Sequence, residues 1–300
     1  MWFKNIHFYK FEDEFKLDAQ ALHTALDTRK TRGCGQMEMS AQGWCPPVGK
    51  NGLMLAHQTD GNLMICLRRE DKVLPASLVK EQVELQAEQI EQQAGRPVGR
   101  KERLDIKDAV LQELMPRALV KTSQTFAAIL PKRGWFVVNA SSAKKAEELI
   151  EYLRKTLGSF NVVLPSTDES LEAAMTTWLL NEQDLPADFT VEDACEMRSS
   201  NENEGVIRCS SVDLGSEEVR AHINTGYRVK KLAMNWQERL SFVLSEDLSV
   251  KRMRFDTEII DGAGDSSDDE ASRFDADFAI MSAELEEFIP ALLAAVKAKA

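Results

Sequence analysis

The sequence predicts an α+β protein built from mixed antiparallel sheets with flanking helices. Two observations lead to this fold class. Apolar, alternating segments are joined by short turns, as around Thr59-Asp60-Gly61 and at the Pro-Lys-Arg-Gly turn of residues 131–134, a pattern typical of hairpins. Other segments carry apolar residues at helical spacing, as in SSAKKAEELIEYLRKTLG (residues 141–158), which predicts helices that pack one face on a sheet.

The first 74 residues read mainly as strands. Phe3–Tyr9 alternates around aromatic and β-branched residues and predicts a strand. Leu17–Leu26 predicts a short helix. The segment GWCPPVGKNG (residues 43–52) is interpreted as a turn-rich connector, because Pro and Gly fix or free the backbone there. Leu53–His57 and Asn62–Arg68 predict a hairpin.

Residues 75–117 predict a projecting helical segment. Pro75 begins a helix that Ser77 is expected to cap, and Gly95 and Pro97 end it. A second helix is predicted over residues 101–114. Both helices have narrow apolar stripes, which favours a projecting hairpin or a dimer contact over a deep core.

Residues 118–159 predict a ββα unit. Lys132 and Arg133 lie at the tip of its hairpin. Ser141 or Ser142 is expected to cap the helix, and Gly158 to end it. The buried stripe of this helix is predicted to be Ala146, Leu149, Ile150, Leu153 and Leu157.

Residues 160–300 predict further sheet and a closing helix. After an acidic segment, a strand at GVIR and a helix near Glu217–Ile223 precede a meander of three strands. In the last strand, Met253 and Phe255 are expected to share a face with Lys251, with Arg252 and Arg254 opposite. Arg228 and Lys230 are expected to share a face as well. The acids of GAGDSSDDEAS (residues 262–272) are expected in a loop before an amphipathic C-terminal helix.

Composition excludes several classes of protein. The 300 residues include five scattered cysteines with no CxxC, which argues against a disulfide framework or zinc site and for a reducing cytoplasm. There is no apolar run long enough to span a membrane and no apolar core of a signal peptide. No phosphate-binding, hydrolase, metalloprotease or deaminase motif occurs, and DSSDDE lacks EF-hand spacing. The sequence therefore predicts binding without catalysis, and no cofactor or metal.

Charge is distributed in blocks along the chain. Residues 96–155 hold 13 bases and 7 acids, and residues 207–254 hold 9 bases and 6 acids. Residues 165–206 hold 11 acids and one base, and residues 255–290 hold 12 acids and one base. One interpretation is that the acids only solubilise the exterior and neutralise the bases. The other is a basic surface flanked by acidic ones, which would attract a polyanion although the net charge is −12.

Several long segments resemble the bacterial recombination-associated RdgC family. They are, in order, MWFKN, GWCPP, LPASLVK, MPRAL followed by SQTF, SAKKAEELIEYLRKTLGS, VKKLAMNWQERLSFVLSED, KRMRF and RFDADFAIMSAEL. The resemblance covers nearly the whole chain.

This resemblance implies a non-catalytic, nucleoid-associated, cytoplasmic protein that binds double-stranded DNA with little sequence preference. It implies an elongated, multi-lobed subunit that forms a ring-shaped homodimer with a basic inner wall, and restraint of the RecA recombinase. Within one chain of residues 1–300, residues 1–74 and 160–300 would form sheet-bearing base and centre lobes. The helical segment and the ββα unit would complete the subunit.

The chain departs from the family pattern at two places. Ser210 and Ser211 stand where a basic pair is expected, and Leu119 stands where an aromatic is expected. These changes would weaken phosphate attraction and soften a dimer contact, so neighbouring bases are the better candidates. The candidate DNA-binding residues are Arg117, Lys121, Lys132, Arg133, Lys144, Lys145, Arg228, Lys230, Lys231, Lys251, Arg252 and Arg254. The rival hypothesis is an acidic protein-interaction module that regulates a recombinase by direct contact without binding DNA; a nuclease is a third.

Overall fold

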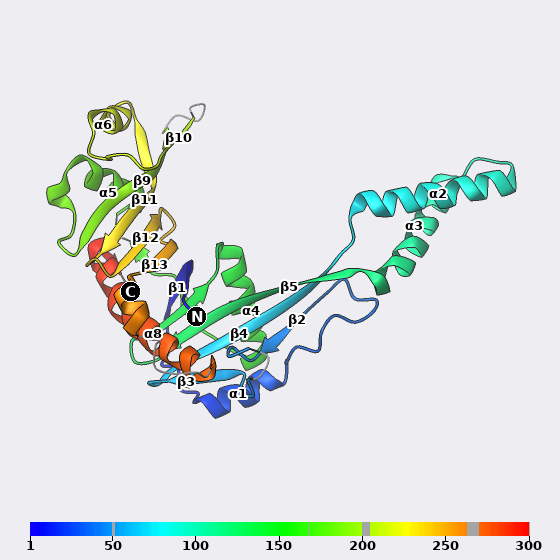
Figure 1. Cartoon of the computed structure of the whole chain (residues 1–300), viewed down its shortest axis with the longest axis horizontal. Coiled ribbons are helices and arrows are strands. Elements are labelled where there is room, and N and C mark those ends of the chain that lie inside the picture. The colour runs from blue at the N-terminus through cyan, green and yellow to red at the C-terminus, as the bar shows by residue number, and fades with distance from the viewer. Residues whose placement is uncertain (50–51, 168, 200–204, 263–269, 300) are drawn as a thin grey trace.

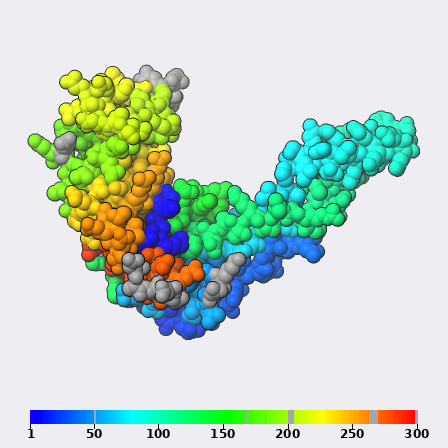
Figure 2. All heavy atoms as spheres, viewed as in Figure 1, coloured from blue at the N-terminus to red at the C-terminus, as the bar shows by residue number. Residues whose placement is uncertain are grey.

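The computed structural model describes residues 1–49, 52–167, 169–199, 205–262 and 270–299. Figure 1 shows a curved subunit: the distal half of a large sheet forms one arm, a pair of helices forms the other, and the concave side lies between them. The space-filling view keeps this hollow open (Figure 2). The predicted α+β class is confirmed.

A twelve-stranded sheet runs through the described residues, and its strand pairs are antiparallel. Its main path is β10-β9-β11-β12-β13-β1-β6-β5-β4-β2, with β3 beside β4 and β7 beside β1. The proximal half consists of β1 (Ile6–Phe11), β2 (Ser40–Cys45), β3 (Ala56–Thr59), β4 (Asn62–Val73), β5 (Leu119–Leu130), β6 (Trp135–Asn139) and β7 (Val162–Val163). The distal half consists of β9 (Phe189–Ser199), β10 (Val206–Cys209), β11 (Tyr227–Trp236), β12 (Leu240–Ser245) and β13 (Val250–Phe255).

The helices are unequally shared between the halves. They are α1 (Ala19–Asp27), α2 (Ala76–Ala94), α3 (Arg100–Leu114), α4 (Ala143–Leu157), α5 (Leu171–Leu180), α6 (Glu217–Asn224), α7 (Thr257–Gly262) and α8 (Glu270–Ala295). Short 3₁₀ turns occupy Met115–Arg117 and Glu182–Asp184, and β8 (Ser166–Thr167) pairs with β14 (Ala298–Lys299). No helix of the described part is long and apolar enough to cross a membrane.

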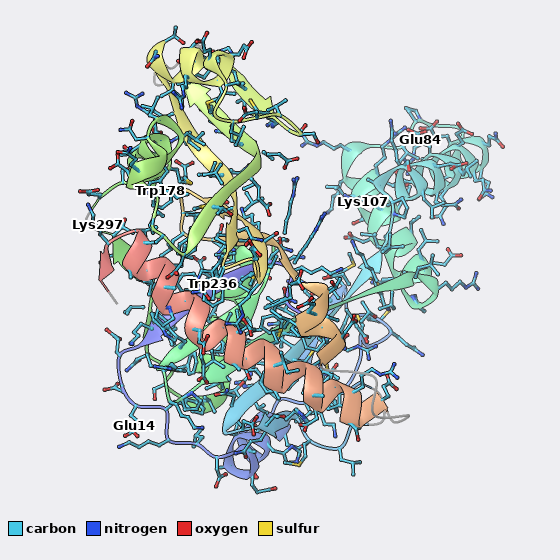
Figure 3. The ribbon with its side chains drawn as sticks, turned by 60° about the vertical axis from the view of Figure 1, so that its left-hand side comes forward. Glu14, Glu84, Lys107, Trp178, Trp236 and Lys297 are labelled. Carbon is cyan, nitrogen blue, oxygen red and sulfur yellow. The ribbon has the colours of Figure 1, made fainter. Side chains whose placement is uncertain are left out.

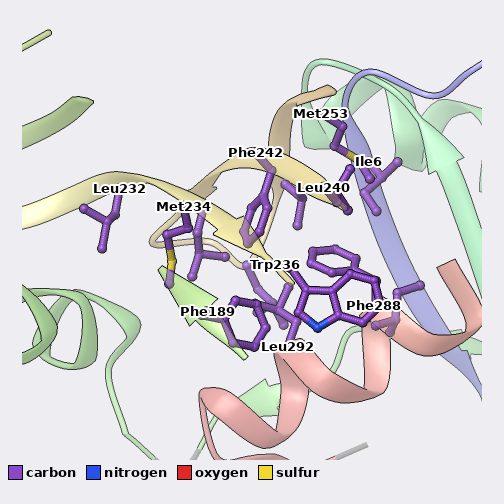
Figure 4. Packing of buried hydrophobic residues seen from close by; sticks show 14 of the residues in the cluster. Ile6, Phe189, Leu232, Met234, Trp236, Leu240, Phe242, Met253, Phe288 and Leu292 are labelled. Atoms are coloured by element: carbon purple, nitrogen blue, oxygen red, sulfur yellow. The ribbon is translucent and has the colours of Figure 1, made fainter. Parts of the chain in front are cut away.

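One face of the sheet is covered along both halves by a single core. α5, α6 and α8 supply apolar side chains to it, and strand residues such as Phe242 and Trp236 meet them. Phe288 of α8 packs its ring 5.0 Å from that of Phe242 and 5.6 Å from that of Trp236 (Figure 4). Leu240, Phe242 and Leu244 are all buried, so alternate residues of β12 form its core face.

The other face is covered only in the proximal half. There α1 and α4 pack on alternate residues of β1, β4, β5 and β6, including Tyr9, Ile65 and Phe136. The predicted stripe of α4 is confirmed for Ala146, Leu149, Ile150 and Leu153, which are buried, whereas Leu157 is half-buried at its end. The same face of the distal half carries no described helix and looks into the concave side (Figure 1).

The arm formed by α2 and α3 (the helical arm) projects from the end of the long β4–β5 ribbon (Figure 1). Its core is small, comprising Val79, Ala87, Val98, Ile106 and Val110. Figure 3 shows Glu84 on α2 and Lys107 on α3, both far from the body of the molecule. Gly95 ends α2, as predicted, and the structure shows it in the left-handed conformation.

Several local predictions were wrong. Pro75, not Ser77, is the residue before the first turn of α2, and no side chain caps it. For the acidic segment after residue 165 no element was predicted, and the structure shows α5 and β9 there. The predicted connector begins as strand β2. Gly43 marks the reason, since a Cβ there would lie 2.5 Å from the Thr31 backbone, which pairs with Trp44. The acidic loop predicted at residues 262–272 lies mostly outside the described residues.

Candidate nucleic-acid interface

The exposed sheet face of the distal half (the open face) is formed by residues that alternate with the core. On β11 and β12, Leu232 faces Leu244 in the core, so Lys231 and Val243 point to the opposite side. The register places Lys231 next to Glu196 of β9, and Glu196 next to Arg208 of β10. The strand period therefore aligns bases from three strands across one surface.

The open face contains a cavity of about 350 Å³. Four bases line it, namely Arg208, Lys231, Lys251 and Arg252, and Glu196 is the one carboxylate among the lining residues. The remaining lining residues are Ala194, Cys195, Cys209, Ser210 and Val243. The cavity is therefore locally cationic in a protein whose overall charge is strongly negative.

Glu196 organises the bases around it. Its carboxylate accepts a hydrogen bond from Arg208 at 3.0 Å and one from Lys231 at 3.1 Å, and Arg198 approaches to 3.5 Å. Burial acts to raise the pKa of Glu196, but the bonds from Lys231 and Arg208 outweigh it, so the pKa lies below its ordinary value. One buried carboxylate thus fixes three bases and leaves an excess of positive charge directed outward.

A bulge in β13 corrects the predicted facing of its bases. The pairing of β12 and β13 slips between Ser241 and Val243, and Arg252 has a positive φ of 53°. As a result Val250, not Lys251, shares the buried side with Met253 and Phe255. Lys251 pairs with Val243 and lines the cavity together with Arg252, and Arg254 is exposed opposite Ser241.

A second bulge, in β11, separates Arg228 from Lys230. The pairing with β9 shifts between Val229 and Lys231, so the prediction that Arg228 and Lys230 share a face was wrong. Lys230 instead donates to Glu172 of α5 at 2.5 Å and to Glu246 at 2.6 Å. These bonds, Glu172 first, raise the pKa of Lys230 above its ordinary value.

Arg228 lies at the outer end of the open face. It is exposed and directly opposite Arg198 of β9. Two adjacent arginines repel each other in the absence of an anion, because like charges directly opposite on a sheet are destabilising. The pair therefore extends the cationic surface beyond the cavity.

The open face continues to the start of α4. The backbone N–H of Arg252 donates to the side-chain oxygen of Asn5 at 3.2 Å, and that of Met253 donates to the Lys4 carbonyl at 2.8 Å. Asn139, at the end of β6, accepts from the same N-terminal segment. Lys144 and Lys145 follow in the first turn of α4, where both are exposed.

His7 lies buried at this junction. Burial lowers its pKa, Lys251 adds to the lowering, and Asp247 and Glu147 oppose it. Since Glu147 belongs to α4, the charges of β13 and of α4 act on one group. The strand register shows how these residues face: Ile6 pairs with Val250 and both lie in the core beneath α8, so His7 and Lys251 point to the other side, which α4 covers in the proximal half. The open face and the α4-covered face are therefore the same side of the sheet.

Other candidate bases lie elsewhere. Lys132 donates to the Asp60 carbonyl at 3.1 Å, and Arg133 lies 3.9 Å from Glu286 of α8. Arg133 is therefore on the side of α8, and Lys132 lies at the β5–β6 turn beside the β3–β4 turn, outside the cavity lining. Arg117 and Lys121 are exposed on the ribbon that leads to the helical arm, apart from the cavity.

Sequence reasoning missed two bases of this surface. Arg198 is the single base of an acidic block, and Arg208 belongs to the GVIR segment but was not among the candidates. The signal that could have found them is the pairing of β9 with β10 and β11, which places Arg208 opposite Glu196 and Arg198 opposite Arg228. Ser210, where the family pattern expects a base, lines the cavity, and Ser211 has a φ of 56°. Leu119 is 80% exposed at the base of the helical arm.

Comparisons with known proteins agree over the full length. A family model described as "Putative exonuclease, RdgC" matches residues 1–299. The chain belongs to the RdgC family. A recombination-associated protein RdgC of Aeromonas hydrophila is 46% identical over 297 residues, covering 99% of this chain and 98% of the relative. Relatives of the same name from Tolumonas auensis and Pseudomonas fluorescens are 41% and 40% identical, covering 99% of this chain and 98% and 97% of the relatives.

The two kinds of description differ about catalysis. The family model names an exonuclease, whereas the relatives are named for recombination. Across the described ranges, no group of three or more His, Cys, Asp or Glu side chains could hold a metal ion. What this family supports directly is an association with DNA recombination.

Proposed function

We propose that this protein binds double-stranded DNA without sequence preference and without catalysis. The observation that carries the proposal is the open face, where four bases and one carboxylate surround a cavity on the concave side of the subunit. Its side chains are lysines and arginines on strands, which suit phosphate oxygens and do not form a reading helix for base edges. Contact with the phosphate backbone of DNA alone gives binding that is independent of the DNA sequence.

We also propose that two copies of the subunit form a ring. A curved subunit with its cationic face on the inside becomes a closed ring when a two-fold axis joins both ends to a second copy. The helical arm offers one contact, since Leu78, Leu85 and Leu104 are exposed on it and Leu119 is exposed at its base. The sheet-bearing end offers the other. In this arrangement the homodimer encircles the duplex in the nucleoid and restrains RecA-dependent recombination by occupying the DNA.

The test is fluorescence anisotropy of a labelled duplex titrated with the protein over a salt series, beside a duplex of scrambled sequence. We expect equal affinity for both and a steep loss of affinity with salt, because bound phosphates release counterions. Absence of binding even at low salt would overturn the proposal and favour a protein-interaction module. A loss of labelled strand on adding Mg²⁺ would overturn the non-catalytic part.

Two further measurements address the ring and its consequence. Light scattering should give twice the mass of one chain, and a ring should stay on closed circular DNA at salt concentrations that release it from short linear DNA through the free ends. Strand exchange by RecA should fall as protein covers the duplex. Inhibition at concentrations too low to cover the DNA would instead indicate direct contact with the recombinase.

A further inference from the structure

Two cysteines face each other across the edge of the proximal half, far from the open face. Cys45 of the edge strand β2 is directly opposite Cys66 of β4. Residues opposite one another in antiparallel strands have Cα atoms about 4.5–5.5 Å apart, and disulfides span about 4.4–6.8 Å. The backbone therefore already has the spacing that a bond between these sulfurs requires.

The surroundings of the pair shift the pKa values of the two thiols in opposite directions. The Cys66 thiol donates a hydrogen bond to the Cys45 sulfur, and this bond, against the effect of burial, lowers the pKa of Cys45 to about 7. The Gln124 side-chain nitrogen lies 3.5 Å from the same sulfur, and the Arg68 guanidinium adds positive charge. The hydrogen bond from the Cys66 thiol to Cys45, together with burial, raises the pKa of Cys66. Cys45 is thus the thiol that loses its proton more easily.

A second facing pair provides an internal comparison. Cys195 of β9 is directly opposite Cys209 of β10. Burial, followed by the effects of Cys209, raises the pKa of Cys195 to about 12. Both pairs therefore share the spacing, and the first pair additionally has a side-chain N–H donor, Gln124, 3.5 Å from the Cys45 sulfur.

We propose that Cys45 and Cys66 form a reversible thiol–disulfide site that is oxidised by hydrogen peroxide. The Cys45 thiolate attacks one oxygen of the peroxide, the O–O bond breaks, and hydroxide leaves, so that Cys45 becomes a sulfenic acid. The Cys66 sulfur then attacks the Cys45 sulfur, the S–O bond breaks, and water leaves with the Cys66 proton. A small-molecule dithiol reverses the change by thiol–disulfide exchange.

The bond would have a defined structural effect. β2 is paired only with β4 in the main sheet path, and β4 continues into the ribbon that carries the helical arm. A disulfide at Cys45 and Cys66 would fix the edge strand to that ribbon. It would raise the unfolding temperature under non-reducing conditions, because it restricts the unfolded chain.

The test is peptide mapping of the full-length protein after graded treatment with peroxide, with free thiols alkylated before digestion. We expect a disulfide-linked peptide pair containing Cys45 and Cys66 at low peroxide doses. Cys34, Cys195 and Cys209 should remain free thiols at these doses and be recovered in alkylated form. A dithiol should restore both thiols. Cys45 and Cys66 remaining free at doses that oxidise Cys34, or a linked Cys195–Cys209 pair appearing first, would overturn the proposal.

Single variants separate the two roles. In Cys66→Ser, Cys45 should stop at the sulfenic acid and react with dimedone, whereas in Cys45→Ser the Cys66 thiol should stay reduced. Cys195→Ser is the matched control and should leave the linked pair unchanged. Dimedone labelling of Cys66 in Cys45→Ser at wild-type rates would contradict the assignment. Mapping of the wild-type chain decides the main question even if a variant folds poorly.

Discussion

The two halves of the large sheet differ in whether helices cover their second face. The proximal half covers both faces, with α1 and α4 on one and α8 on the other. The distal half covers one face with α5, α6 and α8 and leaves the other to bases arranged around Glu196. An antiparallel sheet tolerates one wet face. On the solvent-exposed face of the distal half, the bases that line the cavity outnumber the acids, which favours binding of a polyanion. The proposed function rests on this difference between the two halves.

The largest expected effect concerns the covered side. Phe288→Ala removes a ring that packs on Trp236 and Phe242 in the core, and we expect a loss of about 3–5 kcal/mol in the free energy of unfolding. Val243→Ala on the open face is the matched control and should cost about 1 kcal/mol or less. Urea unfolding measures both. Equal losses would show that the open face is packed in the free protein.

The next effect concerns DNA affinity. Lys231→Gln, Lys251→Gln and Arg252→Gln together should weaken duplex binding and make the dependence of log affinity on log salt shallower by about one unit for each base removed. Lys132→Gln with Arg133→Gln is the matched control, because Arg133 contacts α8 and Lys132 lies at the β5–β6 turn, outside the cavity lining. Anisotropy titrations at several salt concentrations compare the two sets. A larger effect from the control set would place the DNA on the other side of the sheet.

The smallest effect concerns Glu196. Its pKa is lower in the folded state, so the stability it contributes is present above its ordinary value of 4.5 and is lost as the pH falls through the folded value. Glu196→Gln should lower the free energy of unfolding by about 1–2 kcal/mol at neutral pH. It should also reduce the loss of stability that the wild-type protein shows as the pH falls below 4.5.

The same variant removes the one carboxylate that lines the cavity and should tighten duplex binding. Glu286→Gln, which alters the partner of Arg133 on the α8 side, is the matched control and should leave duplex affinity unchanged. Unfolding curves at several pH values and anisotropy titrations provide the measurements. Weaker duplex binding by Glu196→Gln would show that the positioning of the bases by this carboxylate contributes more to DNA affinity than the charge it neutralises costs.

The sequence predicted most elements because their patterns are local. The α4 stripe, the hairpin at Asp60-Gly61 and the distal meander follow from spacing and turn residues. β2 was missed because the reason for Gly43 is a close backbone approach from residue 31, which a linear pattern does not display.

The candidate site was predicted less completely, for a similar reason. The two-residue period fails at the bulges beside Arg252 and Lys230, and both depend on pairing with neighbouring strands. Arg198 was hidden by an acidic block because its contribution depends on lying opposite Arg228. Block charge indicated that a basic surface exists, and only the strand register showed which bases share it.

The most direct test of DNA binding at the open face is acetylation footprinting of lysines with and without saturating duplex DNA, quantified by mass spectrometry. We expect strong protection of Lys231 and Lys251 and unchanged labelling of Lys132 at the β5–β6 turn. Protection of Lys132 with unchanged labelling of Lys231 and Lys251 would contradict it.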